Sequence, residues 1–119
     1  MRDRLRPEGT LLISLRDYGP LMKQRPAAIP PAMFLDDGRR RIVHQIWDWR
    51  DDRRYTVHLY ITRQMPTGRW TTSHFLGHYR AMTPDEVASC AEQVGFRQVR
   101  ILMPAETDYY QPVVTAIRT

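Results

Sequence analysis

The chain has 119 residues, of which 42% are hydrophobic and 26% are charged. This is the size of one small domain, because a single hydrophobic core usually serves roughly 100–200 residues. The longest aliphatic runs are far shorter than the ~20 apolar residues of a membrane-spanning helix, so no membrane partner is expected. The apolar stretch after the basic start ends at Arg16, too early for a secretory signal, which predicts a cytoplasmic protein.

The formal net charge is +5, and of the 18 basic residues only Lys23 is a lysine. Guanidinium groups match phosphate and carboxylate groups, but biased codon use is an alternative source of the arginine excess. The arginines are scattered among acidic residues, which argues against nucleic acid as a partner. Cys90 is the only cysteine, so no intrachain disulfide can form, in keeping with a reducing compartment.

The first elements in chain order are a turn and a strand. Residues 5–10 have turn composition, and the apolar run Leu11–Leu15 predicts a strand buried on both faces. Three prolines fall in the segment Leu21–Pro31, which predicts a loop lying over a surface. Asp36–Gly38 then predicts a tight turn.

Between residues 39 and 80 the pattern becomes β-rich. Three segments, Ile42–Trp49, Tyr55–Ile61 and Trp70–Tyr79, predict an antiparallel three-stranded meander. A hairpin closed around Asp51-Asp52 places one set of side chains on one face, namely Ile42, Ile46, Val57 and Ile61. It places a mixed aromatic and polar set on the other face, namely Val43, Trp47, His58 and Tyr60.

The last third of the chain predicts one helix and two strands. Thr83 is the expected N-cap, Pro84 the first helical residue and Glu86 the capping-box partner, and Gly95 ends the helix. The segments Val99–Met103 and 112–117 are expected strands, joined by residues 105–111.

Several of these segments resemble class I S-adenosylmethionine-dependent methyltransferases. Residues 5–13 are similar to the Leu-(Lys/Arg)-Pro-Gly-Gly turn and fifth strand of that family, with Glu8 in place of the first glycine. The capped helix, Gly95-Phe96 and the last two strands resemble the end of the same fold. Four segments are more specifically similar to small-molecule N-methyltransferases of the glycine and sarcosine type, namely residues 14–18, 45–49, 78–80 and 109–112.

The resemblance implies an α/β fold that is the C-terminal half of a Rossmann-like methyltransferase fold with an inserted antiparallel β-meander. Residues 1–119 are then a single partial domain. Its parts are the central strand and turn at 5–18, the substrate-covering meander at 39–80, and the final helix and two strands at 83–119.

In that family the cofactor, S-adenosylmethionine, sits on a Gly-x-Gly loop. No two glycines of this chain are separated by a single residue, since they stand at positions 9, 19, 38, 68, 77 and 95. The cofactor-binding residues are therefore unknown, and the chain alone is expected to be inactive.

The expected site lies where strands end, because ligands of open α/β sheets bind beyond the carboxyl ends of parallel strands. Arg16 and Tyr18 follow one predicted strand, and Tyr109 and Tyr110 follow another, so the two pairs converge if the strands are parallel. The resemblance implies that Arg16 binds the carboxylate of a small-molecule methyl acceptor, with Tyr18 and Tyr110 lining the transfer site.

The meander completes this expected site. Tyr79 is assigned to substrate binding, and a lid is assigned to Trp47, Trp49 and Tyr109. Each assignment has a structural alternative, because an arginine at a strand end can pair with a nearby acid such as Asp17, and exposed aromatics often simply pack on a sheet.

No catalytic acid, base or nucleophile and no metal site is assigned. The four histidines, His44, His58, His74 and His78, are distributed over three predicted strands without a carboxylate at ligand-like spacing, which favours hydrogen-bonded sheet residues. The expected partners are the methyl acceptor and either the missing half of the enzyme or a second copy, through an unpaired edge of strand 11–15. The alternative is a non-catalytic module that binds a ligand or a protein through its meander.

Overall fold

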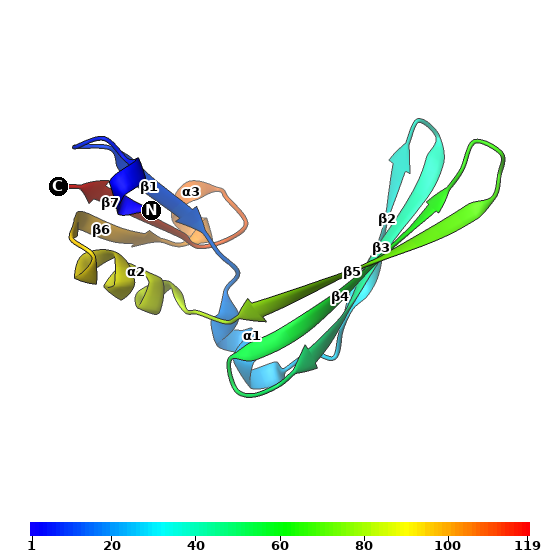
Figure 1. Cartoon of the computed structure of the whole chain (residues 1–119), viewed down its shortest axis with the longest axis horizontal. Helices are drawn as coiled ribbons and strands as arrows, with labels where there is room; N and C mark the ends of the chain where they lie inside the picture. Colours follow the sequence, from blue (N-terminus) through cyan, green and yellow to red (C-terminus); the bar gives the residue numbers. More distant parts are fainter. The chain divides into compact units, whose positions relative to one another are not determined.

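A computed structural model describes residues 1–119, which form two compact units (Figure 1). The first unit combines Met1–Pro20 with Met82–Thr119, and the second is Leu21–Ala81. Each unit contains its own antiparallel sheet, so the chain is a mixed α/β protein. No helix has the length and apolar character needed to cross a membrane.

The first unit is built on a three-stranded sheet in the order β1-β7-β6. Its strands are β1 (Thr10–Ser14), β7 (Val113–Arg118) and β6 (Phe96–Leu102). Both outer strands pair antiparallel with β7, so β1 and β6 run in the same direction and their carboxyl ends lie at the same edge. Two short helical turns complete the unit, η1 (Arg2–Arg4) and α3 (Pro104–Thr107).

Helix α2 (Pro84–Gln93) follows the sequence prediction closely. The Glu86 backbone N–H donates to the Thr83 hydroxyl at 3.3 Å, and the Thr83 N–H donates to the Glu86 carboxylate at 2.9 Å. These two bonds satisfy amides that the helix itself leaves without partners. Gly95 follows the helix with a φ of +89°, a conformation that favours glycine, and so confirms the predicted end.

The core of the first unit lies between α2 and the sheet. It contains Leu11, Ala91, Phe96 and Ala116. The prediction of a strand buried on both faces is wrong for β1, because Leu12 is 66% exposed while Leu11 is buried. A strand at the edge of a sheet with a helix on one face buries alternate residues only.

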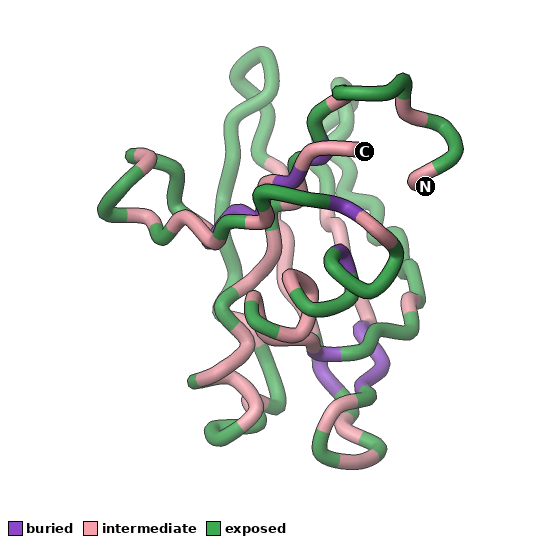
Figure 2. Tube along the Cα trace, turned by 90° about the vertical axis from the view of Figure 1, so that its left-hand side faces the viewer, coloured by how far each residue is buried: buried purple, intermediate pink, exposed green.

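The second unit is a four-stranded meander, β2-β3-β4-β5. The three strands expected between residues 39 and 80 are present as β3 (Arg39–Trp49), β4 (Arg54–Gln64) and β5 (Trp70–Arg80). Buried residues occur only in short separate stretches of the chain (Figure 2). Most of β5 is exposed along its length.

The prediction of a loop at residues 21–31 is wrong. The structure has helix α1 (Tyr18–Gln24) and then strand β2 (Ala28–Asp36), which adds a fourth strand to the meander. The pairing of β2 with β3 is interrupted between Ile29 and Ala32, where Pro30 and Pro31 stand. Prolines lack an amide donor, but an edge strand tolerates them at a bulge.

The expected turn at Asp36–Gly38 is present. Asp37 and Gly38 have φ values of +52° and +77°, as a two-residue hairpin turn of type I′ requires. The second turn, Met65–Gly68, also forms, and the Gly68 N–H donates to the Met65 carbonyl at 2.9 Å.

The predicted faces of the meander are wrong, because the β3–β4 pairing is shifted by one residue. A turn centred between Asp51 and Asp52 would pair Trp49 with Arg54, whereas Trp49 pairs with Tyr55. Since side chains alternate along a strand, a shift of one residue moves every side chain of the second strand to the opposite face.

The observed faces follow from the cross-strand pairs. One face carries Val43, Trp47, Trp49, Tyr55, Val57, Ile61 and Tyr79. The other carries Ile42, His44, Ile46, Asp48, His58, Tyr60 and His74. Trp47 therefore lies with Val57 and Ile61, and not with His58 and Tyr60.

Candidate functional site

Arg16 and the two tyrosines of the loop before β7 lie close together in the first unit. The Leu15 N–H donates to the Pro112 carbonyl at 3.1 Å, which joins the segment after β1 to the segment before β7. The rings of Tyr109 and Tyr110 have centroids 4.8 Å apart. The sequence predicts that these residues converge if the strands before them run in the same direction. β1 and β6 do run in the same direction.

The titration of Tyr110 reports this proximity. A side-chain hydrogen bond with Tyr109 raises the pKa of Tyr110 above its usual value, and the negative charge of an ionised Tyr109 would act in the same direction. The positive charge of Arg16 acts in the opposite sense and lowers the pKa of Tyr110. Tyr110 is 76% exposed and Tyr109 39% exposed, so both hydroxyl-bearing rings are open to a ligand.

Tyr18 is the first residue of α1 and is half-buried, two residues beyond Arg16. Arg16 is also half-buried, and both side chains take part in interactions within the structure. Their assignment to the methyl acceptor stays a prediction.

The other predicted aromatic residues gather on one face of the second unit. Tyr55 is the centre of this aromatic cluster, with ring centroids 4.5 Å from Trp47, 4.8 Å from Trp49 and 5.6 Å from Tyr79. The Trp49 indole N–H donates to the Pro26 carbonyl at 3.1 Å, and the Trp47 indole to the Gln45 side chain at 2.8 Å.

Exposure separates the members of the aromatic cluster. Trp47 and Tyr55 are each only 3% exposed, so their rings fill the interior of this face. Tyr79 is 51% exposed and, with His78 and three arginines, borders a hollow of about 260 Å³. The lid and substrate roles of Trp47, Trp49 and Tyr79 stay predictions. Tyr55 was missed by the sequence analysis, because only the observed register shows that it lies between the two tryptophans.

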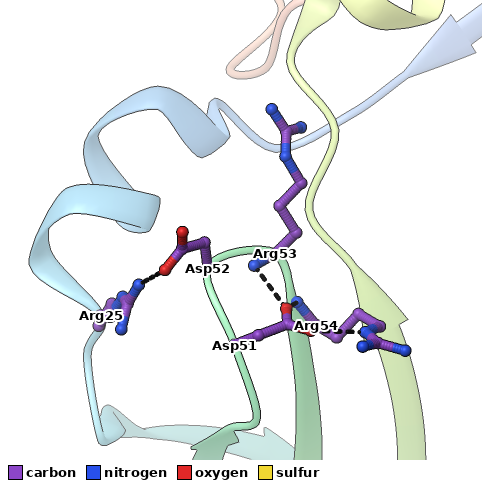
Figure 3. Close-up of polar contacts among 5 residues, drawn as sticks. All are labelled: Arg25, Asp51, Asp52, Arg53 and Arg54. Carbon is purple, nitrogen blue, oxygen red and sulfur yellow. Dashed lines mark hydrogen bonds and ion pairs between the residues drawn. The ribbon is translucent and has the colours of Figure 1, made fainter.

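The turn beside this cluster is held by two aspartates (Figure 3). Asp51 accepts hydrogen bonds from the backbone N–H groups of Arg53 and Arg54 at 2.9 and 2.8 Å, and from the Arg54 side chain at 2.7 Å. These bonds, the backbone N–H of Arg53 first, lower the pKa of Asp51 to about 2. Asp52 pairs with Arg25, which follows α1.

The histidines form a hydrogen-bonded row on the opposite face of the same sheet. His58 Nδ1 lies 2.9 Å from His74 Nε2, and His58 Nε2 lies 3.0 Å from an Asp48 carboxylate oxygen. His78 Nδ1 lies 3.1 Å from the Thr56 hydroxyl. His58, His74 and His78 are thus hydrogen-bonded sheet residues, whereas the His44 ring stacks on Tyr60. The Asp48 carboxylate contacts His58, which the sequence spacing did not predict.

Comparisons with known proteins bear on the fold. The two antiparallel sheets with their helices make this a mixed α/β chain. It is similar to the crystal structure of Streptomyces venezuelae DesVI, with a TM-score of 0.68 and 14% sequence identity over 99% of this chain and 48% of DesVI. The chain therefore spans about half the length of DesVI. No family model and no curated protein matches the sequence.

Proposed function

We propose that this chain is the acceptor-binding, C-terminal portion of an S-adenosylmethionine-dependent methyltransferase that acts on a small amine or amino acid. The observation that carries the proposal is the likeness to DesVI over nearly all of this chain and about half of DesVI, which accompanies the resemblance of the sequence to the second half of methyltransferases. The order of elements also agrees with the resemblance to the second half of that fold.

The open side of the first unit supports an incomplete domain. An apolar hollow of about 480 Å³ lies beside α2, and its walls include Leu11, Ile13, Val94 and Phe96. Strand β1 has a partner on one side only. An apolar hollow next to an unpaired strand edge fits the packing of further chain from the same enzyme.

The residues of this chain do not by themselves form the cofactor site of the family, because there is no Gly-x-Gly loop. The proposal therefore assigns S-adenosylmethionine mainly to the complementary half. This chain contributes the Arg16, Tyr109 and Tyr110 group, in which a guanidinium can bind an acceptor carboxylate as a bidentate pair. Arg16 favours an amine that carries an acid group as the acceptor.

The first test is calorimetry with S-adenosylmethionine. The 119-residue chain alone is expected to show no binding, whereas the chain joined to the segment encoded directly upstream should bind the cofactor and methylate an amine. Micromolar binding of S-adenosylmethionine by the isolated chain would contradict the assignment of the cofactor to the complementary half. An unrelated upstream segment would favour a non-catalytic module.

A matched pair of variants tests the acceptor role of Arg16 in the completed enzyme. Arg16→Ala should raise the acceptor KM by roughly tenfold to a hundredfold, the value of a charged hydrogen bond, with less effect on kcat. Arg97→Ala is the control, since Arg97 pairs with Glu8 on the surface of the same unit. Equal KM values for the two variants would remove the assignment.

A further inference from the structure

Three arginines surround one carboxylate at the turn end of the second sheet. Hairpin pairing places Asp36 opposite Arg39, and Arg41 opposite Arg63. All four residues stand on the same face, because Arg39 and Arg41 are two apart on β3. We call these four residues the Asp36 cluster.

The charges of this cluster do not balance. Arg41 donates to both carboxylate oxygens of Asp36, from Nε at 2.6 Å and from Nη2 at 3.3 Å. Of the three arginines, only Arg41 forms an ion pair, so Arg39 and Arg63 are left without a carboxylate. Like charges directly opposite one another on neighbouring strands are destabilising, and this is the position of Arg41 and Arg63.

The Asp36 carboxylate lies in the positive field of all three arginines. The hydrogen bond from Arg41 holds the pKa of Asp36 below its usual value, and the positive charges of Arg63 and Arg39 lower it further. All three guanidinium groups thus act on one point. Three positive charges and one negative charge leave an excess of two.

The surroundings of the cluster can receive a ligand. The Arg41 guanidinium lies 4.6 Å from the centre of the Phe34 ring, a contact that steadies its plane. All four residues of the Asp36 cluster line a hollow of about 330 Å³ between the two turns of this end of the sheet. Guanidinium groups bind phosphate oxygens in pairs, so an oxyanion in this hollow would find several donors.

We propose that the Asp36 cluster is a binding site for a phosphate group, carried by a small phosphate monoester or present as inorganic phosphate. A phosphate monoester has a charge of about −1.5 to −2 at pH 7, which matches the excess of the cluster. Arg39 and Arg63 provide the donors for it, and Arg41 stays with Asp36. This site is independent of the proposed methyl transfer.

The test is calorimetry of the full chain in phosphate-free, low-salt buffer, with inorganic phosphate and with glycerol 3-phosphate as probes. Arg39→Gln and Arg63→Gln should each weaken binding by about tenfold, because each removes a charged hydrogen bond. Asp36→Asn should strengthen binding, since it removes the internal competitor. Arg97→Gln, in the other unit, is the control and should bind like the wild-type chain. Circular dichroism checks that each variant is folded.

Tighter binding of glycerol 3-phosphate than of inorganic phosphate would identify the ester as the ligand, and equal binding would identify the phosphate group alone. Both results support the site. Equal affinity of the wild-type chain and the two glutamine variants would overturn it. The site would also be overturned if a single-stranded oligonucleotide bound more tightly than either probe and lost as much affinity in Arg97→Gln as in Arg39→Gln and Arg63→Gln. That pattern is typical of a diffuse basic surface.

Discussion

Trp49 and Tyr55 are directly paired across the β3–β4 hairpin, with ring centroids 4.8 Å apart. This pair is part of the β3–β4 register, which decides which side chains of the two strands share a face. It gathers the aromatic cluster on one face and leaves the histidine row on the other. The five-residue turn between these partners, held by Asp51, is therefore a structural determinant of the predicted substrate cover.

Two neighbouring substitutions test the observed faces. Trp47→Ala should lower the free energy of unfolding by about 3–5 kcal/mol, because it removes a buried ring from the aromatic cluster. Ile46→Ala, one residue away on the opposite face, should cost much less, since Ile46 is 41% exposed. Urea denaturation followed by circular dichroism measures both. Equal losses would mean that the register is different.

The titration of Asp51 gives a pH-dependent prediction. Its folded pKa of about 2 lies below the usual 3.8, so its contribution to stability is present above about pH 4 and is lost as the pH falls through about 2. A carboxyl NMR titration should show a midpoint near 2. Arg54→Ala, which removes one of the three hydrogen bonds, should move that midpoint upward. A wild-type midpoint near 3.8 would show that the turn bonds are not formed.

Gly77 provides a test of the position of Tyr79. A Cβ atom at Gly77 would lie 2.7 Å from a ring carbon of Tyr79, so this ring covers the glycine. Gly77→Ala should displace the Tyr79 ring and separate it from Tyr55, which would change the NMR shifts of both rings. Ser73→Ala, on the same strand and face, is the control and should leave these shifts in place. Unchanged Tyr79 shifts in Gly77→Ala would contradict the packing.

The capping box of α2 gives a prediction for the first unit. Thr83→Ala should destabilise the unit by about 1 kcal/mol, because the Glu86 amide loses its side-chain acceptor. Ser89→Ala, at an exposed position of the same helix, should have little effect. Thermal unfolding of the two variants measures the difference, and an equal Tm for both would show that the cap contributes nothing.

Local chemistry was sufficient to predict several elements. The Thr83–Glu86 capping box, the Asp37-Gly38 turn and the three β-rich segments all depend on residues within a few positions of one another. A strand interrupted by Pro30 and Pro31 could not be predicted in the same way. Its formation depends on β3 as a partner and on a place at the edge of the sheet.

The sequence by itself determined the α/β class, the helix and its cap, the turns and the kinds of side chain available for a site. Only the tertiary structure decided the register across Trp49 and Tyr55, the half-buried state of β1 and the approach of Arg16 to Tyr110. The physical reason is the separation along the chain of the residues that interact. Caps and turns are fixed by neighbouring residues, whereas strand pairing and charge proximity join residues that are distant in the chain and have several competing partners.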